Sequence, residues 1–211
     1  MIRQPMTSSG RHWYADQVPA HHLEFYRLSL KLAQIYTILT VKATHALIMA
    51  CLSDQDTFNK CEYLIKHEKD SVNLTNYEQY IPLHAASQKG LVDVCTLLLH
   101  NEANVHARTY QELTCFHFAA IFNWIQVMDL LLMHGARIDD RGSNNNMPIH
   151  EAAYHGALNA VAYLLDKGIS INVPGYANQS PLCAAASYGR IGVVDELIRR
   201  VADLRHQDRN G

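Results

Sequence analysis

A 33-residue internal repeat constrains the fold of this chain more than any other feature of its sequence. Four segments, at 81–105, 114–138, 147–171 and 180–204, align without a gap. Each carries Ala two residues after a shared register position and a pair of aliphatic residues near its end. The register positions are His84, His117, His150 and Cys183. A strict period of this length predicts a solenoid, in which each unit buries its apolar face against its neighbours.

Each repeat is expected to hold two short helices. Three of the four segments have Pro two residues before the register position, at Pro82, Pro148 and Pro181. Proline fits the first turn of a helix, because the N–H that it lacks has no partner there. The second half of each segment carries an aliphatic stripe that one unit cannot bury alone. The stripe comprises Val94, Leu97, Leu98, Val127, Leu130, Leu131, Val161, Leu164, Leu165, Val194, Leu197 and Ile198.

These motifs resemble the ankyrin repeat, whose signature is TPLHxAA followed by GH, a second helix ending in LLxxGA, and a β-hairpin. The resemblance covers about 45–211. It implies an all-α fold, an ankyrin-repeat solenoid of stacked helix-turn-helix units with β-hairpin loops. It also implies that the register histidines are structural and hydrogen-bond the backbone in and between neighbouring loops. Because Cys183 replaces the last histidine, we expect that repeat to be held together less firmly.

The period and the resemblance together divide the chain into segments. Residues 1–19 are expected to be flexible. The segment 20–44 has apolar residues at helical spacing and is expected to be an N-terminal capping helix, or alternatively a partner-binding amphipathic helix. Repeats are predicted at 45–77, 78–110, 111–143, 144–176 and 177–208, the first of them degenerate with a lengthened turn between its helices. Residues 209–211 read as the start of a further repeat, so we expect more to follow.

The segment IHEAAYH, at 149–155, suggests a zinc site, but its spacing argues against one. In HExxH the two histidines are four residues apart on one helical face. His150 and His155 are five apart, which is a rotation of about 140°. The chain also lacks GxSxG, a P-loop and a cysteine in an activating environment. We therefore expect no enzyme activity, metal or cofactor within it.

Composition and cysteine usage narrow the class of partner. The formal net charge is −2, so the overall charge gives no electrostatic attraction to nucleic acid or to an anionic membrane. The helical segment 23–41 is too polar to span a bilayer. The five cysteines form no CxxC pair, which favours reduced thiols in the cytoplasm. We expect Cys51, Cys95, Cys115 and Cys183 to be buried, and the chain to be a monomer in isolation.

The resemblance implies a binding surface made of the hairpin tips and the exposed positions of each first helix, which together line a concave groove. The helix positions, four and five residues after the register, are Gln88, Lys89, Ile121, Phe122, Tyr154, His155, Ser187 and Tyr188. The tips, seven residues before it, are Tyr77, Tyr110, Ser143 and Tyr176. Exposed tyrosine offers contact area and a hydrogen bond at low entropic cost. We favour binding for Phe122, Tyr154 and Tyr188, whereas the tip tyrosines fit binding and stacking on neighbouring hairpins equally well.

These features predict a protein–protein interaction module, a scaffold or adaptor that binds a peptide or protein. The alternative is the N-terminal recognition or regulatory arm of a larger enzyme or effector, whose activity lies beyond residue 211. If such an effector were delivered by an intracellular bacterium, its location would be the host cytosol.

Three substitutions within the repeats predict local departures. Asn123 stands where the family has Gly between the helices, and Asn tolerates the left-handed backbone best after Gly. Trp124 begins a second helix, where we expect packing rather than a contact site. Val201 replaces the Gly that ends the second helix, present as Gly135 and Gly168. Because a β-branched residue is strained at positive φ, we expect the chain to turn differently near Val201.

Overall fold

The computed structural model describes residues 46–53 and 56–209. All of them belong to one unit of the chain, residues 40–211. The predicted flexible N-terminus (1–19) and capping helix (20–44) lie outside the described residues, as do the last two residues.

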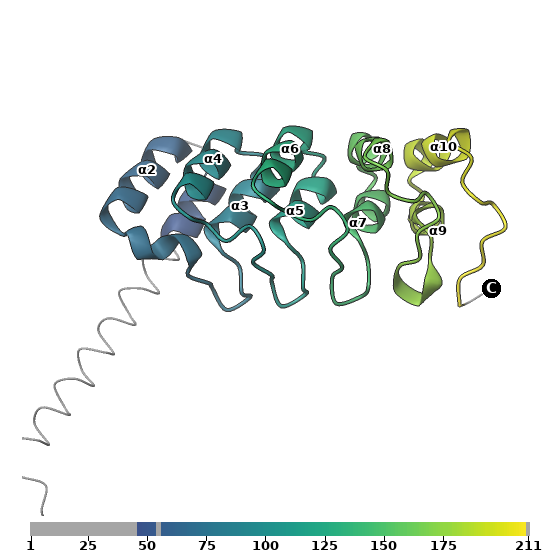
Figure 1. The fold of residues 1–211 in the computed structure, drawn as a ribbon, viewed down its shortest axis with the longest axis horizontal. Coiled ribbons are helices and arrows are strands. Elements are labelled where there is room, and N and C mark those ends of the chain that lie inside the picture. Colours follow the sequence, from purple (N-terminus) through teal and green to yellow (C-terminus); the bar gives the residue numbers. More distant parts are fainter. Residues whose placement is uncertain (1–45, 54–55, 210–211) are drawn as a thin grey trace, which may run out of the picture. The chain divides into compact units, whose positions relative to one another are not determined.

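The described helices form two layers (Figure 1). One layer consists of α2 (Thr57–His67), α4 (Val92–His100), α6 (Ile125–Met133), α8 (Leu158–Asp166) and α10 (Ile191–Arg199). The other layer consists of α3 (Pro82–Lys89), α5 (Cys115–Ile121), α7 (Pro148–His155) and α9 (Pro181–Ser187). Residues 46–52 are helical as well, and two short 3-10 helices, η1 (Lys69–Asn73) and η2 (Tyr176–Asn178), lie in loops. Each helix contacts the next in its layer and the other member of its pair, which confirms the predicted all-α solenoid.

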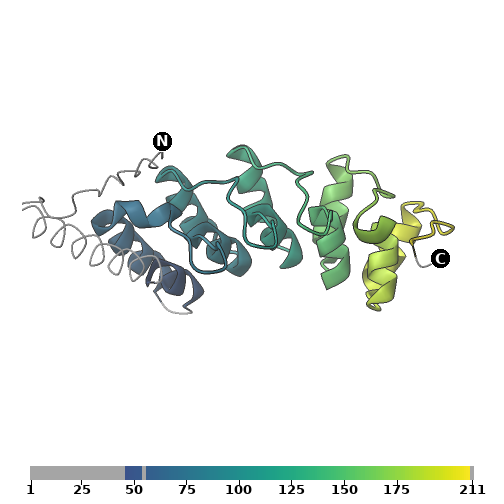
Figure 2. The same ribbon diagram turned by 90° about the horizontal axis from the view of Figure 1, so that it is seen from below.

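The loops that join one helix pair to the next all project on the side of the α3, α5, α7 and α9 layer, and Figure 2 shows the pairs in chain order. A backbone hydrogen bond closes the base of each loop, with N–O distances of 2.8–3.0 Å. The bonds join Asn76 to Tyr80, Thr109 to Leu113, Gly142 to Asn146 and Gly175 to Gln179. Within the described residues a single isolated bridge, Arg108 with Thr114, has β geometry. The predicted hairpins therefore have turns but no strands, because one closing bond per loop does not continue into a ladder.

The core lies between the two layers and consists of the residues that the repeat marks. Leu98, Leu131, Leu164 and Leu197 are fully buried, each in the same place of its unit. Burying such a side chain stabilises the fold by about 1.5–3 kcal/mol. The small alanines of the first helices are also fully buried, at Ala86, Ala119, Ala152 and Ala185. Their size lets neighbouring helices pack closely.

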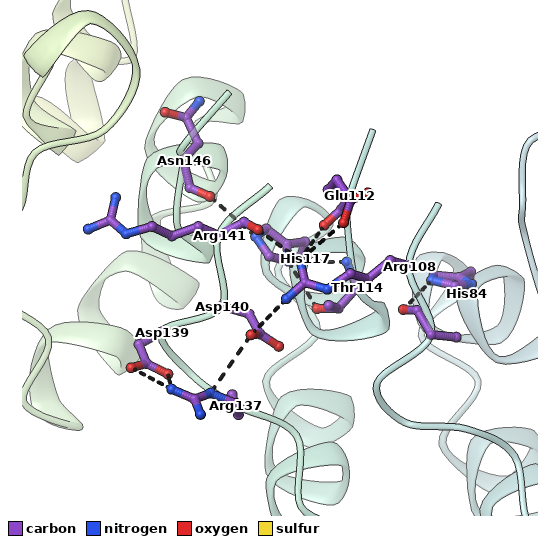
Figure 3. Close-up of polar contacts among 11 residues, drawn as sticks. His84, Arg108, Glu112, Thr114, His117, Arg137, Asp139, Asp140, Arg141 and Asn146 are labelled. Atoms are coloured by element: carbon purple, nitrogen blue, oxygen red, sulfur yellow. Dashed lines mark hydrogen bonds and ion pairs between the residues drawn. The ribbon is translucent and has the colours of Figure 1, made fainter. Parts of the chain in front are cut away.

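The register histidines join the start of each first helix to the loop that follows it. In each, Nδ1 accepts a hydrogen bond from the backbone N–H three residues earlier, at 3.1–3.2 Å. Nε2 then faces a carbonyl oxygen, at 3.2 Å for His84 with Ala107 and 2.9 Å for His150 with Val173. In His117 this contact is longer, because Nε2 lies 3.5 Å from the backbone carbonyl oxygen of Asn146 (Figure 3). Burial lowers the pKa of all three to about 4, so the neutral ring supplies one acceptor and one donor.

Cys183 makes a weaker version of the same contacts. Its Sγ lies 3.3 Å from the Ser180 hydroxyl and 3.9 Å from the His206 oxygen. These long contacts agree with the expectation that this repeat is held together less firmly. Cys51, Cys95 and Cys115 are buried as predicted, but the prediction of burial was wrong for Cys183, which is half-buried. The reason is its place in the last described helix pair, where no further described unit covers it.

The turns between and after the helices test the predictions made for the backbone at Asn123 and Val201. Asn123 has a φ of 64°, matching the 73° of Gly90 one unit earlier. Val201 contradicts the expectation of a different turn, because its φ is 66° and its chain follows the same path as at Gly168. The N–H after the left-handed residue bonds the carbonyl five residues earlier in both places, Ile169 to Leu164 and Ala202 to Leu197. Packing of α10 therefore imposes on Val201 a conformation that its branched side chain disfavours.

Trp124 packs against the preceding unit, as expected. Its Nε1 donates to the backbone carbonyl oxygen of Gln88 at 2.9 Å. Its ring lies so close to Gly90 that a Cβ there would sit 2.4 Å from a ring carbon. Gly90 is thus required both for its positive φ and for this close approach.

Candidate functional site

An open groove of about 730 Å³ lies where the C-terminal ends of α7 and α9 face the loops 142–146 and 175–179. Five predicted binding residues line it, namely Tyr154, His155, Tyr176, Ser187 and Tyr188. The remaining lining residues are Asn144, Asn146, Glu151 and Gln179. We call this site the tyrosine groove. The structure thus brings together residues from three separate segments of the chain.

Two tyrosines form the aromatic wall of the tyrosine groove. The ring centroids of Tyr154 and Tyr188 lie 3.9 Å apart, with the planes inclined by 49°. A hydrogen bond with Tyr188 raises the pKa of Tyr154 above its usual value. Tyr188 is 51% exposed and Tyr154 is half-buried. The two rings therefore combine an accessible aromatic surface with a direct contact between neighbouring units.

Arg190 holds this wall in place. Its Nε donates to the Tyr154 oxygen at 2.9 Å, a carbonyl in the last turn of α7. Its side chain runs over Gly156, where a Cβ would lie 3.0 Å from the Arg190 Cδ. Trp124 makes the equivalent bond to Gln88. The residue seven positions after the register thus closes the preceding first helix in two units, a role that the sequence analysis missed for Arg190.

Asn146 joins the two loops of the tyrosine groove to α7. Its Nδ2 donates to Glu151 Oε1 at 2.9 Å, and its Oδ1 accepts from the Tyr176 backbone N–H at 2.8 Å. Gly175 allows this approach, since a Cβ there would lie 2.7 Å from Asn146 Oδ1. The sequence analysis missed Asn146 and Glu151. Asn is a common turn residue, but its partners lie 5 and 30 residues away, and no periodic pattern marks them.

A second, smaller hollow of about 440 Å³ lies between α3, α5 and the loop at residue 110. Two predicted residues, Gln88 and Tyr110, line it. Sequence reasoning missed Tyr80, whose hydroxyl donates to Gln88 Oε1 at 2.8 Å, and Phe118, whose ring centroid lies 5.1 Å from that of Tyr80. The apolar Ile48 also lines this hollow. Tyr80 and Phe118 fill space here rather than offering a free surface, because both are only partly exposed.

The other predicted residues line neither hollow. Tyr77 is 91% exposed, so it does not stack on a neighbouring loop. Lys89 is exposed at the end of α3, and Ile121 is half-buried at the end of α5. Phe122 follows α5 and is 43% exposed. The predicted surface is therefore concentrated at the tyrosine groove rather than spread evenly along the array.

Two arginines spaced by one repeat, Arg108 and Arg141, tie successive loops together, and Figure 3 draws the contacts of Arg108 with Asp140 and Glu112. Arg108 donates to the oxygens of Glu112 and Arg141, at 3.1 and 2.8 Å, and pairs with Asp140 at 2.9 Å. Arg141 donates to the oxygens of Asn145 and Pro174, at 2.6 and 2.9 Å. These contacts fix the loops that border the tyrosine groove. The signal that could have found them is the spacing of 33 residues between the two arginines.

The two histidines of IHEAAYH have separate environments. The His150 ring is held between the Met147 N–H and the Val173 oxygen, whereas His155 lines the tyrosine groove. Burial lowers the pKa of His155 below its usual value, so the ring is neutral near pH 7. The two rings do not converge on one point, as their spacing predicted.

Comparison with known proteins agrees with this architecture. A family model described as ankyrin repeats, in three copies, matches residues 22–109 and 106–175. None of the curated proteins matches the chain. Within the described residues, no helix has the length and apolar character needed to cross a membrane. Ankyrin repeats are generally modules of protein–protein interaction without catalytic activity. With most of its length matched and its helix pairs in the corresponding order, the chain belongs to the ankyrin-repeat family.

Proposed function

We propose that this chain is a protein-binding module whose main binding site is the tyrosine groove. The observation that carries the proposal is the convergence of Tyr154, Tyr176 and Tyr188 on one open groove of about 730 Å³. Accessible aromatic side chains grouped in a concave site are typical of binding hot spots. Tyr77, Tyr110 and Phe122 are secondary contacts in this proposal, together with Gln88, Lys89 and Ile121.

The supports of the tyrosine groove favour binding without large rearrangement. Arg141 ties the loop 142–146 to the next loop, and Asn146 ties both loops to α7. Arg190 closes the end of α7 behind Tyr154. A site that is held in shape before binding loses less conformational entropy when its partner arrives. This preorganisation supports a specific partner rather than unspecific adhesion.

The test is an affinity capture from a eukaryotic cytosolic lysate with three proteins side by side. They are the wild type, the double variant Tyr154→Ala with Tyr188→Ala, and a control variant Gln126→Ala with Met133→Ala. The control alters two exposed residues of α6, in the other helix layer. Circular dichroism and thermal melting establish that all three are folded, and mass spectrometry reads the retained proteins.

We expect a protein that the wild type and the control retain and that the tyrosine variant loses. Binding of that protein is then measured with purified components. If every retained protein is captured equally by all three, the tyrosine groove is not the binding site and the proposal is wrong.

A further inference from the structure

The tyrosine groove contains the carboxylate of Glu151, which is paired with none of the basic side chains that the structure describes. Glu151 lies on α7, one turn before Tyr154 and His155. Its Oε1 accepts the Asn146 amide at 2.9 Å, which sets the direction of the carboxylate at the groove wall. Within the described part of the chain, Glu151 forms no ion pair.

Several carboxylates of the array form ion pairs with basic side chains, whereas Glu151 forms none with the described residues. Among these pairs are Asp129 with Lys167, Asp140 with Arg108, Asp166 with Arg200, and Glu196 with Arg199 and Arg200. Each of these pairs lies outside the tyrosine groove. Within the tyrosine groove, by contrast, no ion pair between described residues balances the charge of Glu151.

The charges around Glu151 do not cancel it. His155, on the next turn, is neutral near pH 7. Arg190 lies beside the groove, and its Nε donates to the backbone carbonyl oxygen of Tyr154 at the C-terminal end of α7. The negative end of the helix dipole offsets part of that charge. The groove as a whole therefore favours a positive group over a negative or an apolar one.

The aromatic residues strengthen the same preference. The face of a tyrosine ring carries negative electrostatic potential and attracts cations within about 6 Å of its centre. Tyr154 and Tyr188 form one wall of the groove, and Tyr176 belongs to the loop opposite. An apolar occupant would bury the charge of Glu151 without a counter-ion, which costs free energy. A basic side chain meets both the carboxylate and the rings.

We infer, building on the proposed function, that the tyrosine groove recognises a lysine or arginine side chain of its protein partner, with Glu151 as the counter-ion and the tyrosine rings around the cation. The groove is open and of a size typical for ligand sites, about 300–1,000 Å³, so it has room for one basic side chain with its flanking residues. This assigns to Glu151 a binding role that its place in the repeat does not require.

The test is a selection of random peptides displayed on phage, carried out on purified wild type, Glu151→Gln and Glu62→Gln. Glutamine keeps the oxygen that accepts the Asn146 hydrogen bond and removes only the charge. Glu62 is an exposed residue of α2, far along the chain from the groove, so its variant controls for net charge. Peptides that bind the wild type are resynthesised with the shared basic residue changed to norleucine, and their affinities for all three proteins are measured.

We expect wild type and Glu62→Gln to select peptides that share a lysine or arginine at one position. Loss of the charge at Glu151, or of the basic residue in the peptide, should weaken binding by roughly tenfold or more. The two changes together should cost little more than either alone. Such coupling assigns the effect to this pair.

Two other outcomes have distinct meanings. Peptides that require Tyr154 and Tyr188 but share no basic residue, or bind Glu151→Gln equally well, would overturn the cation site while leaving the tyrosine groove as the binding site. Selected peptides that bind the Tyr154→Ala with Tyr188→Ala variant as well as the wild type would overturn the groove as the binding site, and the cation site with it.

Discussion

The helix pair α7–α8 and the pair α9–α10 have the same geometry, but the residues at two key positions of the second pair favour that geometry less. In the first, His150 bonds the Val173 oxygen at 2.9 Å and Gly168 ends the second helix. In the second, Cys183 approaches the His206 oxygen only to 3.9 Å, and Val201 takes up the left-handed turn. Packing against a well-formed neighbour thus holds the last pair in a shape that its own residues disfavour. In a solenoid, where each unit contacts only its neighbours, this difference predicts a gradient of stability.

Lowering the pH should reduce the difference in stability between the two helix pairs more strongly than any single mutation. Burial holds the pKa of His84, His117 and His150 near 4 in the folded chain, against about 6.5 when unfolded. The unfolded chain therefore binds more protons below pH 6.5, and stability falls as the pH decreases from 6.5 to 4. The slope should be roughly 1 kcal/mol per pH unit for each histidine. Urea denaturation at several pH values measures it, and His150→Asn should flatten the curve.

Truncation of a core leucine should next separate the last pair from an inner pair, α5–α6, to which Leu131 belongs. Leu131 and Leu197 are both fully buried, so each change to Ala removes the same atoms from a similar place. We expect Leu131→Ala to cost about 2–5 kcal/mol, because it opens a cavity between units on both sides. Leu197→Ala should mainly expose the amides of α9 and α10. Hydrogen exchange read by mass spectrometry distinguishes the two, and equal loss of protection along the whole array would contradict the gradient.

A reciprocal exchange at the helix ends tests the strain directly. Gly168 and Val201 occupy equivalent turns, with φ of 92° and 66°. Val201→Gly should stabilise the chain by about 1 kcal/mol, and Gly168→Val should destabilise it by about 1–2 kcal/mol. No atom lies within 4 Å of a Cβ at Gly168, so the cost there is conformational rather than steric. Thermal denaturation measures both, and shifts of the same sign would show that strain is not the cause.

Restoring the register histidine should have the smallest effect. Cys183→His would place ring nitrogens where the weak thiol contacts now lie, near the Ser180 hydroxyl and the backbone carbonyl oxygen of His206. We expect a gain of about 1 kcal/mol from the better hydrogen bonds. Hydrogen exchange of the residues after α10 should slow at pH 7. Because a buried histidine loses its advantage in acid, the gain should vanish near pH 4, and a gain that persists there would contradict this origin.

The fold and the binding site differ in how far sequence reasoning reaches. The period identified the paired helices and the buried leucines, because each unit meets the same neighbours in the same way, and the resemblance to the ankyrin repeat identified the structural histidines. Five of the predicted binding residues line the tyrosine groove, since register also sets which residues end each first helix. Glu151, Asn146 and Arg190 were missed. Their roles depend on partners in other units, and the partner residues do not repeat.

By itself, then, the sequence determined that this chain folds as an ankyrin solenoid, because a 33-residue apolar pattern can be buried only by stacking. Through the resemblance to the ankyrin repeat, it also indicated that His84, His117 and His150 bond the backbone, which the structure confirms. Only the tertiary structure decided that Val201 accepts a left-handed turn and that Glu151 has no basic partner among the described residues. Both depend on contacts between units, where packing outweighs the preference of a single residue and the distance to a charge is set by the fold.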